Sequence, residues 1–233
     1  MNHKAVMIAM GSRNETLAGE LTKDYEARGY QVIRSEERTQ EGVKNAYEKV
    51  EKDGIAVETC ILFPEPVYQV SLFDDDFIER MEASIDEGLI VGAWWLQQTA
   101  NYLNRNGIKG QMIVMNHVSN IVPTQRYSYC SIPEAALANL VRVGVMDTHG
   151  NTDININLLT LGWLESTPME KKWEEEMVRL YGGAKAPVLK CVADQEVIDA
   201  CRAFDLLGGM NGGNIILDNG FAISRTIRQL ENA

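Results

Sequence analysis

The stretch AVMIAMGSRNETLAGELTKDYEARGYQVI, residues 5–33, decides the class of fold. Its apolar run Ala5–Met10 ends at Gly11 and predicts a buried strand. Helix-forming residues follow over Leu17–Ala27 and stop just before a second apolar run at 30–33. Two strands joined through a helix form a β-α-β unit, which places both strands in parallel in one sheet.

The same alternation continues along the rest of the chain. Further strands are expected at Val57–Phe63, Met112–Met115, Ile154–Leu161 and Ile215–Leu217, and helices at Glu41–Lys52, Asp76–Tyr102, Ala135–Val145, Met169–Leu180 and Gln195–Leu206. This pattern predicts an α/β fold with a Rossmann-like, doubly wound parallel sheet between helices. Because no repeat or linker interrupts it, we expect a single domain over 1–233. Ligands in such sheets bind at the carboxyl ends of the strands.

Composition and charge exclude several classes of protein. The 233 residues are 45% hydrophobic and 24% charged, which is ordinary for a globular chain. With 22 Lys and Arg against 33 Asp and Glu, the net charge of −11 argues against nucleic-acid binding. The longest uncharged stretch, Gly88–Asn104, contains four amide side chains, so no membrane span is expected.

The cysteines and histidines show no metal-binding pattern. The four cysteines form no CxxC pair and have no ligand spacing with the three histidines (Cys60, Cys130, Cys191, Cys201; His3, His117, His149). We expect no metal site, and reduced thiols in a cytoplasmic protein.

Four segments in the second half carry a family resemblance. GQMIVMN at 110–116 is similar to the strand before a catalytic serine, and 129–137 is similar to a Tyr-x-x-x-Lys helix. Residues 155–168 are similar to a strand with its Pro-Gly substrate loop, and 187–197 with 213–220 are similar to a last helix and final strand. In this order they resemble the short-chain dehydrogenase/reductase family, which implies an NAD(P)-binding fold.

The cofactor motif of that family is degraded here. The family places Thr-Gly-x-x-x-Gly-x-Gly after the first strand, where the glycines let the pyrophosphate approach the backbone. Residues 10–17, MGSRNETL, keep Gly11 but hold Glu15 and Leu17 at the other two glycine positions. A carboxylate at Glu15 is expected to face and repel the pyrophosphate. We therefore expect this chain to bind no cofactor, and Gly11 is the vestigial candidate of the cofactor site. The alternative is that Ser12 or Arg13 restores cofactor binding.

One element of the family fold is missing from the pattern. The family has a helix and a strand between its second strand and the strand ending Asn-Asn-Ala-Gly, and this unit builds the adenine pocket. Here a single helix at 41–52 leads directly to the strand at 57–63. That strand ends in Phe63-Pro-Glu-Pro66. We therefore predict a fold that lacks one helix-strand unit after the second strand.

No register of the chain restores the family's tyrosine and lysine pair. The lysine four residues after the tyrosine lowers its pKa and binds the cofactor ribose. If Tyr129 is the tyrosine, the lysine position holds Pro133. Two other registers, from Cys130 or Tyr127, place Glu134 there. A glutamate raises the pKa of a neighbouring tyrosine, which is the wrong direction for the chemistry.

The remaining catalytic positions are also incomplete. Ser119 can stand at the serine position, and the family's asparagine falls near Leu89. His117 could act as a general base, but a lone histidine is more often a hydrogen-bonded structural residue. We therefore expect no intact catalytic set, with Ser119 and Tyr129 as vestigial candidates.

The tail after the final strand contains Arg225 and Arg228. In tetramers of the family this tail packs near a two-fold axis and can reach a neighbouring active site. Two arginines there could contact a carboxylate or a CoA phosphate of a partner's substrate, or could form a solvated helix end.

The motifs that are degraded all belong to the cofactor and catalytic site. The segments through which subunits of the family assemble are not degraded. The resemblance implies a non-catalytic subunit of a heteromeric NAD-dependent dehydrogenase acting on a hydroxyacyl-CoA-type substrate. Its partner would be an intact homologue that binds NAD, in a heterotetramer. The alternative is a divergent NAD(P)-dependent reductase using Tyr129 or Tyr127, Ser119 and His117. A third hypothesis is a module that binds a small acid without turnover.

Overall fold

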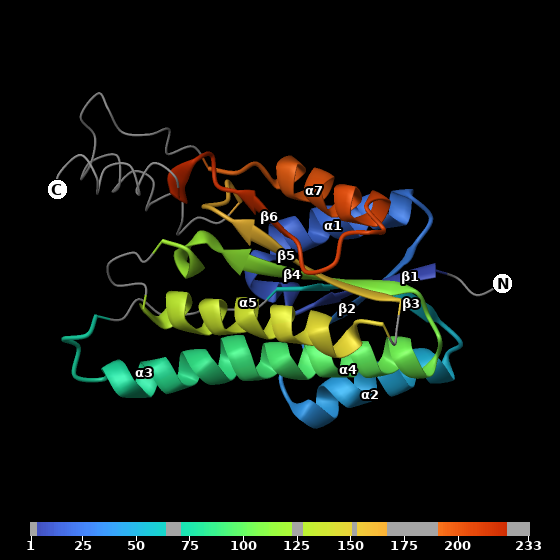
Figure 1. The fold of residues 1–233 in the computed structure, drawn as a ribbon, viewed down its shortest axis with the longest axis horizontal. Helices are drawn as coiled ribbons and strands as arrows, with labels where there is room; N and C mark the ends of the chain where they lie inside the picture. The colour runs from blue at the N-terminus through green and yellow to red at the C-terminus, as the bar shows by residue number, and fades with distance from the viewer. Residues whose placement is uncertain (1–3, 64–70, 123–127, 151–152, 167–190, 223–233) are drawn as a thin grey trace.

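The computed structural model describes residues 4–63, 71–122, 128–150, 153–166 and 191–222. Within these residues six parallel strands form one sheet in the order β2-β1-β3-β4-β5-β6 (Figure 1). The strands are β1 (Lys4–Ala9), β2 (Gln31–Ser35), β3 (Ala56–Leu62), β4 (Gly110–His117), β5 (Ile154–Leu161) and β6 (Asn214–Leu217). The predicted α/β class and parallel sheet are confirmed.

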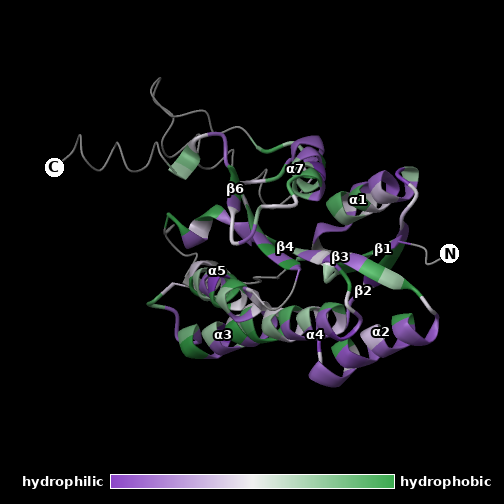
Figure 2. Cartoon of the chain, turned by 45° about the vertical axis from the view of Figure 1, so that its right-hand side comes forward, coloured by the Kyte–Doolittle hydropathy of each residue, from purple (hydrophilic) through white to green (hydrophobic). Residues whose placement is uncertain are grey.

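Helices cover both faces of the sheet. They are α1 (Glu15–Ala27), α2 (Gln40–Lys52), α3 (Phe77–Ser84), α4 (Val91–Arg105), α5 (Ser128–Thr148) and α7 (Asp194–Leu206). In Figure 1, α1 and α7 lie on one face, and α2, α4 and α5 lie on the other. Figure 2 shows α1 and α2 with both hydrophilic and hydrophobic residues, as amphipathic helices on a sheet require.

The predicted shortening of the sheet is confirmed in the described residues. The chain leaves β2, passes through α2, and enters β3, which pairs directly with β1 over Ala9↔Leu62. β2 pairs with β1 and ends the sheet on that side. The direction of strand order therefore reverses between β1 and β3, and this switch point is where ligands of open α/β sheets bind.

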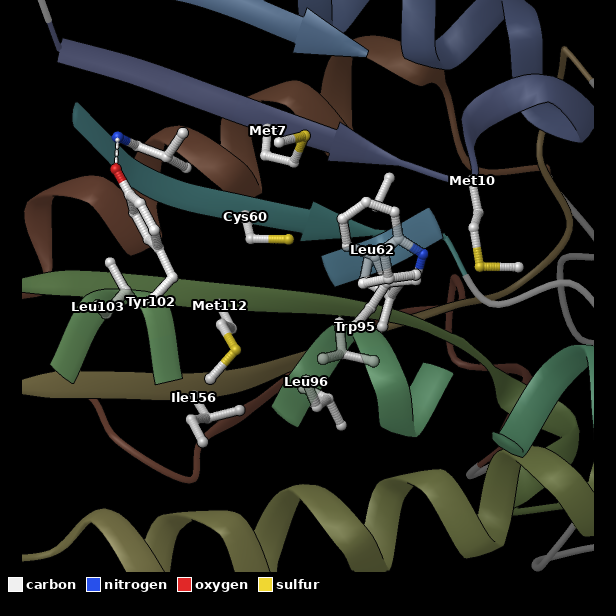
Figure 3. Close-up of a cluster of buried hydrophobic side chains, with 14 of the residues drawn as sticks. Met7, Met10, Cys60, Leu62, Trp95, Leu96, Tyr102, Leu103, Met112 and Ile156 are labelled. Atoms are coloured by element: carbon white, nitrogen blue, oxygen red, sulfur yellow. Dashed lines mark hydrogen bonds between the residues drawn. The ribbon is translucent and has the colours of Figure 1, made fainter. Parts of the chain in front are cut away.

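The core between the sheet and α4 combines aliphatic side chains and methionines with the aromatic rings of Trp95 and Tyr102 (Figure 3). Trp95 is completely buried, and its Nε1 donates to the carbonyl of Glu37 at 3.1 Å. The Tyr102 hydroxyl donates to the carbonyl of Ile55 and accepts from the N–H of Val57, both at 3.0 Å. These bonds fix α4 against the beginning of β3.

Two helices depart from their predicted form. The helix expected at Asp76–Tyr102 is interrupted by one π-helical segment, η2 (Ile85–Ile90), between α3 and α4. α5 begins seven residues before the predicted start at Ala135 and contains Pro133 in its interior. The prediction was wrong at this end because proline usually disfavours a helix interior. No helix of the described chain is both long and apolar enough to cross a bilayer.

Candidate functional site

The first turn after β1 packs so tightly that only glycine fits at position 11. Met10 adopts the left-handed conformation (φ 60°), and a short 3₁₀ helix, η1 (Gly11–Asn14), leads into α1. A Cβ atom on Gly11 would lie 2.8 Å from the Cβ of Ala18. Neither atom can move without its backbone, so Gly11 allows α1 to pack against β1 without any ligand.

Carboxylates bond the N–H of Ser12 in this turn and the side chain of Arg34 beside it. The N–H of Ser12 donates to Glu36 Oε2 at 3.3 Å. Glu15 is exposed and accepts two hydrogen bonds from the Arg34 guanidinium, at 2.7 and 2.5 Å. These bonds lower the pKa of the Glu15 carboxyl, so Glu15 is ionised at neutral pH. The side chain predicted to face a pyrophosphate instead lies against β2, where it pairs with Arg34.

Two further positions at the switch point between β1 and β3 are filled by buried apolar side chains. Leu17, at the family's third glycine position, is fully buried between α1 and the sheet. Phe63, which follows β3, is buried and donates its N–H to the carbonyl of Ala9 at 3.0 Å.

A buried polar cluster lies at the carboxyl end of β4. Glu134, which is 3% exposed, extends from α5 and accepts from the N–H of His117 at 2.8 Å. The same oxygen, Oε2, lies 3.4 Å from the hydroxyl of Ser119. The Glu134 carbonyl accepts from the side-chain amide of Asn116 at 3.0 Å. Glu134 thus fixes α5 to the end of β4 and places a carboxyl group beside the candidate serine.

The imidazole of His117 is held as a neutral hydrogen-bond acceptor. Its Nδ1 accepts from the N–H of Ser119 at 3.2 Å and caps the short helix η3 (Val118–Asn120). Burial lowers the pKa of His117 to about 4. Since Nδ1 is an acceptor in the neutral ring, the proton resides on Nε2.

Trp163, which follows β5, packs against this histidine. The two rings make a T-shaped contact with centroids 5.5 Å apart, and Trp163 makes a second such contact with Phe221 at 4.5 Å. Val118 and Cys191 complete the small buried cluster. Trp163 is 7% exposed, and its buried Nε1 has no hydrogen-bond partner in the described chain. Motif reasoning missed this residue, and a tryptophan directly after the glycine that ends a strand is the signal that could have found it.

The structure describes only some of the other residues that the sequence suggested for the site. Ser119 is buried in the cluster. Tyr129 lies in the first turn of α5, but its side chain is outside the described part, as are Tyr127, Arg225 and Arg228. Three buried cysteines form no disulfide in the described chain (Cys60, Cys191, Cys201), and the described residues contain no metal-binding group of three or more His, Cys, Asp or Glu side chains.

Comparison with known proteins gives a fold and no close relative. No family model and no curated protein matches the sequence. Sorbitol-6-phosphate 2-dehydrogenase from Erwinia amylovora superposes with a TM-score of 0.80 at 16% identity, covering 93% of this chain and 99% of that one. Aldohexose dehydrogenase from Thermoplasma acidophilum gives 0.77 at 15% identity, covering 95% of both chains. A small-chain dehydrogenase in complex with NADPH gives 0.76 at 16%, covering 94% and 99%. The chain therefore has the Rossmann-like fold of these dehydrogenases.

Proposed function

We propose that this chain is a non-catalytic subunit of a heteromeric NAD-dependent dehydrogenase of the short-chain type. Its partner would be an intact homologue that binds NAD and carries out hydride transfer. The observation that supports this most is the first turn, where Glu36 holds the Ser12 N–H and Glu15 holds Arg34. One backbone donor of the turn and one cation beside it, both of which could serve a diphosphate, are bonded to carboxylates.

A cofactor in this turn would meet opposition from both carboxylates. A diphosphate would be repelled by Glu15 and Glu36, because like charges at short range disfavour one another. It would also have to displace Glu36 from the Ser12 N–H before that donor could bind it. A thousandfold loss, from a micromolar to a millimolar dissociation constant, requires about 4 kcal/mol in total. We expect the combined effects to reach this loss.

The polar cluster at β4 supports the same proposal. A proton-transferring tyrosine is assisted by a nearby cation, which lowers its pKa. The group that the structure places beside Ser119 is the carboxyl of Glu134. A carboxylate favours the neutral phenol, so it opposes the ionisation that dehydrogenase chemistry requires.

The substrate class and the assembly complete the proposal. We infer a hydroxyacyl-CoA-type substrate and a heterotetramer, with Arg225 and Arg228 as candidates for contact with the partner or its substrate. An arrangement that the chain resembles is the inactive subunit of the dehydrogenase that oxidises 2-[hydroxy(phenyl)methyl]succinyl-CoA in anaerobic toluene degradation.

Binding and partner identification test the proposal together. Titration calorimetry of the purified chain with NADH should give a dissociation constant weaker than about 1 mM. Purification from the native source should recover a homologue that carries Gly-x-x-x-Gly-x-Gly and Tyr-x-x-x-Lys. Micromolar NADH binding, or dehydrogenase turnover by the chain alone, would show that the proposal is wrong.

A divergent reductase is the second candidate, because Ser119, His117 and Glu134 meet at one strand end. This candidate requires that the chain alone reduce a carbonyl compound with NAD(P)H. Replacing Ser119 with Ala should then lower kcat by at least about a hundredfold. Under the subunit proposal the same substitution leaves the activity of the complex nearly unchanged.

A further inference from the structure

A groove of about 530 Å³ lies between α4 and α5 and extends to the sheet at Ile156. Figure 1 shows the two helices side by side on the face of the sheet that also carries α2. Leu96, Val141 and Ile156 give the groove a largely apolar lining, and Ala100 and Gly144 have little or no side chain to fill it. No described residue of the first turn or of the polar cluster at β4 lines it. Its volume is in the range of sites for small organic molecules.

Asp147 is the one charged side chain among the described residues that line the groove. It is exposed, and its carboxylate makes no hydrogen bond or ion pair with any described residue. Asp147 lies in the last turn of α5, which ends at Thr148 and contains no basic residue. The carbonyl groups at the end of a helix carry partial negative charge, so a carboxylate is unfavourable there and a cation is favourable. The helix end and the carboxylate therefore both favour a cation in this groove.

The α4 side of the groove presents an aromatic ring and two amide groups. Trp94, Gln97 and Asn101 are spaced by three and four residues, so the helical period places them on one face of α4. Trp94 is half-buried, and the face of an indole ring attracts cations. The side-chain amides of Gln97 and Asn101 have no hydrogen-bond partner in the described part of the chain. Their oxygens can therefore accept from an N–H donor of a ligand.

We propose that this groove binds an organic ammonium ion, with an apolar body between α4 and α5 and the charged end beside Asp147. The lining supports a cation, because no lysine, arginine or histidine is among the described residues that form it. An anion would find no opposite charge in that lining and would be repelled by Asp147. The net charge of −11 favours a cation over a second, equally acidic copy of the chain.

This inference does not rest on the proposed function. The groove extends to β5, whereas the carboxylates that oppose a dinucleotide surround the turn after β1. Binding of an ammonium ion and binding of NADH are therefore separate measurements, and either result can fail alone.

Three compounds of similar shape and different charge test the proposal. They are 2-phenylethylammonium, which stays protonated at neutral pH, 2-phenylethanol and 3-phenylpropanoate. The chain has four tryptophans, so protein labelled with ¹⁵N-tryptophan gives four indole signals, and Trp94→Phe assigns that of Trp94. The ammonium should shift the Trp94 signal in a saturable way. The alcohol should bind about fivefold more weakly, the factor that corresponds to about 1 kcal/mol for one exposed ion pair, and the carboxylate should bind more weakly still.

Two substitutions of carboxylates show whether the charge in the groove is responsible. Asp147→Asn should weaken binding of the ammonium about fivefold and leave binding of the alcohol unchanged. Asp53→Asn is the matched control, because Asp53 is also an exposed carboxylate at the end of a helix, α2, but does not line the groove. It should leave the binding of both compounds as in wild type. Added salt should reduce the preference for the ammonium, because exposed ion pairs are screened.

Three results would overturn the proposal. The first is the lack of a saturable shift of the Trp94 signal up to about 100 mM of the ammonium. The second is equal binding of the alcohol or the carboxylate, or an effect of Asp53→Asn as large as that of Asp147→Asn. The third is a dimer, detected by sedimentation of the same samples, that protects the Trp94 indole proton from exchange and excludes the ammonium, because a second copy then occupies the groove.

Discussion

Replacing His117 with Asn should reduce the acid sensitivity of this fold. The folded protein holds the pKa of His117 at about 4 through burial, against an ordinary value of 6.5. Between these two pH values the His117 imidazole is therefore protonated in the unfolded chain but neutral in the folded protein. The contribution of His117 to the free energy of unfolding is complete above pH 6.5 and is lost as the pH falls towards 4.

The magnitude follows from the two pKa values. One pKa unit corresponds to about 1.4 kcal/mol, so the full contribution is roughly 3 kcal/mol. About 2 kcal/mol of it should be lost between pH 7 and pH 5. An asparagine at position 117 can still accept from the Ser119 N–H through its side-chain oxygen, so the cap of η3 is kept.

Urea denaturation at several pH values measures this effect. Wild type should lose about 2 kcal/mol more than His117→Asn over the interval from pH 7 to pH 5. The Glu134 carboxyl bonds to the main chain of residue 117, which the variant retains, so its own contribution is similar in both proteins. The exposed His149, changed to Asn, is the control and should leave the slope as in wild type. If His117→Asn shows the wild-type slope, the folded protein does not hold the pKa of His117 below its ordinary value.

Two other pairs of substitutions test the packing and the polar cluster. Gly11→Ala should lower the free energy of unfolding by about 1–3 kcal/mol, since its Cβ would meet Ala18 at 2.8 Å. Gly19→Ala in α1, where the added Cβ meets nothing, should raise it by up to about 1 kcal/mol, and equal effects in denaturation would disprove the packing role of Gly11. Glu134→Lys should destabilise by about 3 kcal/mol or more, because an ammonium cannot accept from the His117 N–H. Glu134→Gln should cost about 1 kcal/mol, and neither variant should gain dehydrogenase turnover.

The sequence predicted the architecture because burial dictates its pattern. Strands enclosed on both faces are rich in apolar residues along most of their length, and β5 was predicted at its observed bounds. The missing helix-strand unit was also visible, since one helix alone separates the second apolar run from the third. The degraded cofactor motif is evident from Glu15 and Leu17 in the sequence alone. The early start of α5 and the π-helical segment η2 could not be predicted, because tertiary packing overrode local preference.

By itself, the sequence determined the class of fold, the order of its elements and the lack of the glycines and lysine of the family that it resembles. Only the tertiary structure showed where the substituted residues point. Glu15 lies against Arg34 on β2, Glu134 reaches Ser119 from α5, and Trp163 lies beside His117 with an unused N–H. The physical reason is that alternating hydrophobicity is a local property of the chain. Hydrogen-bond partners from different strands and helices depend on how the sheet brings distant segments together.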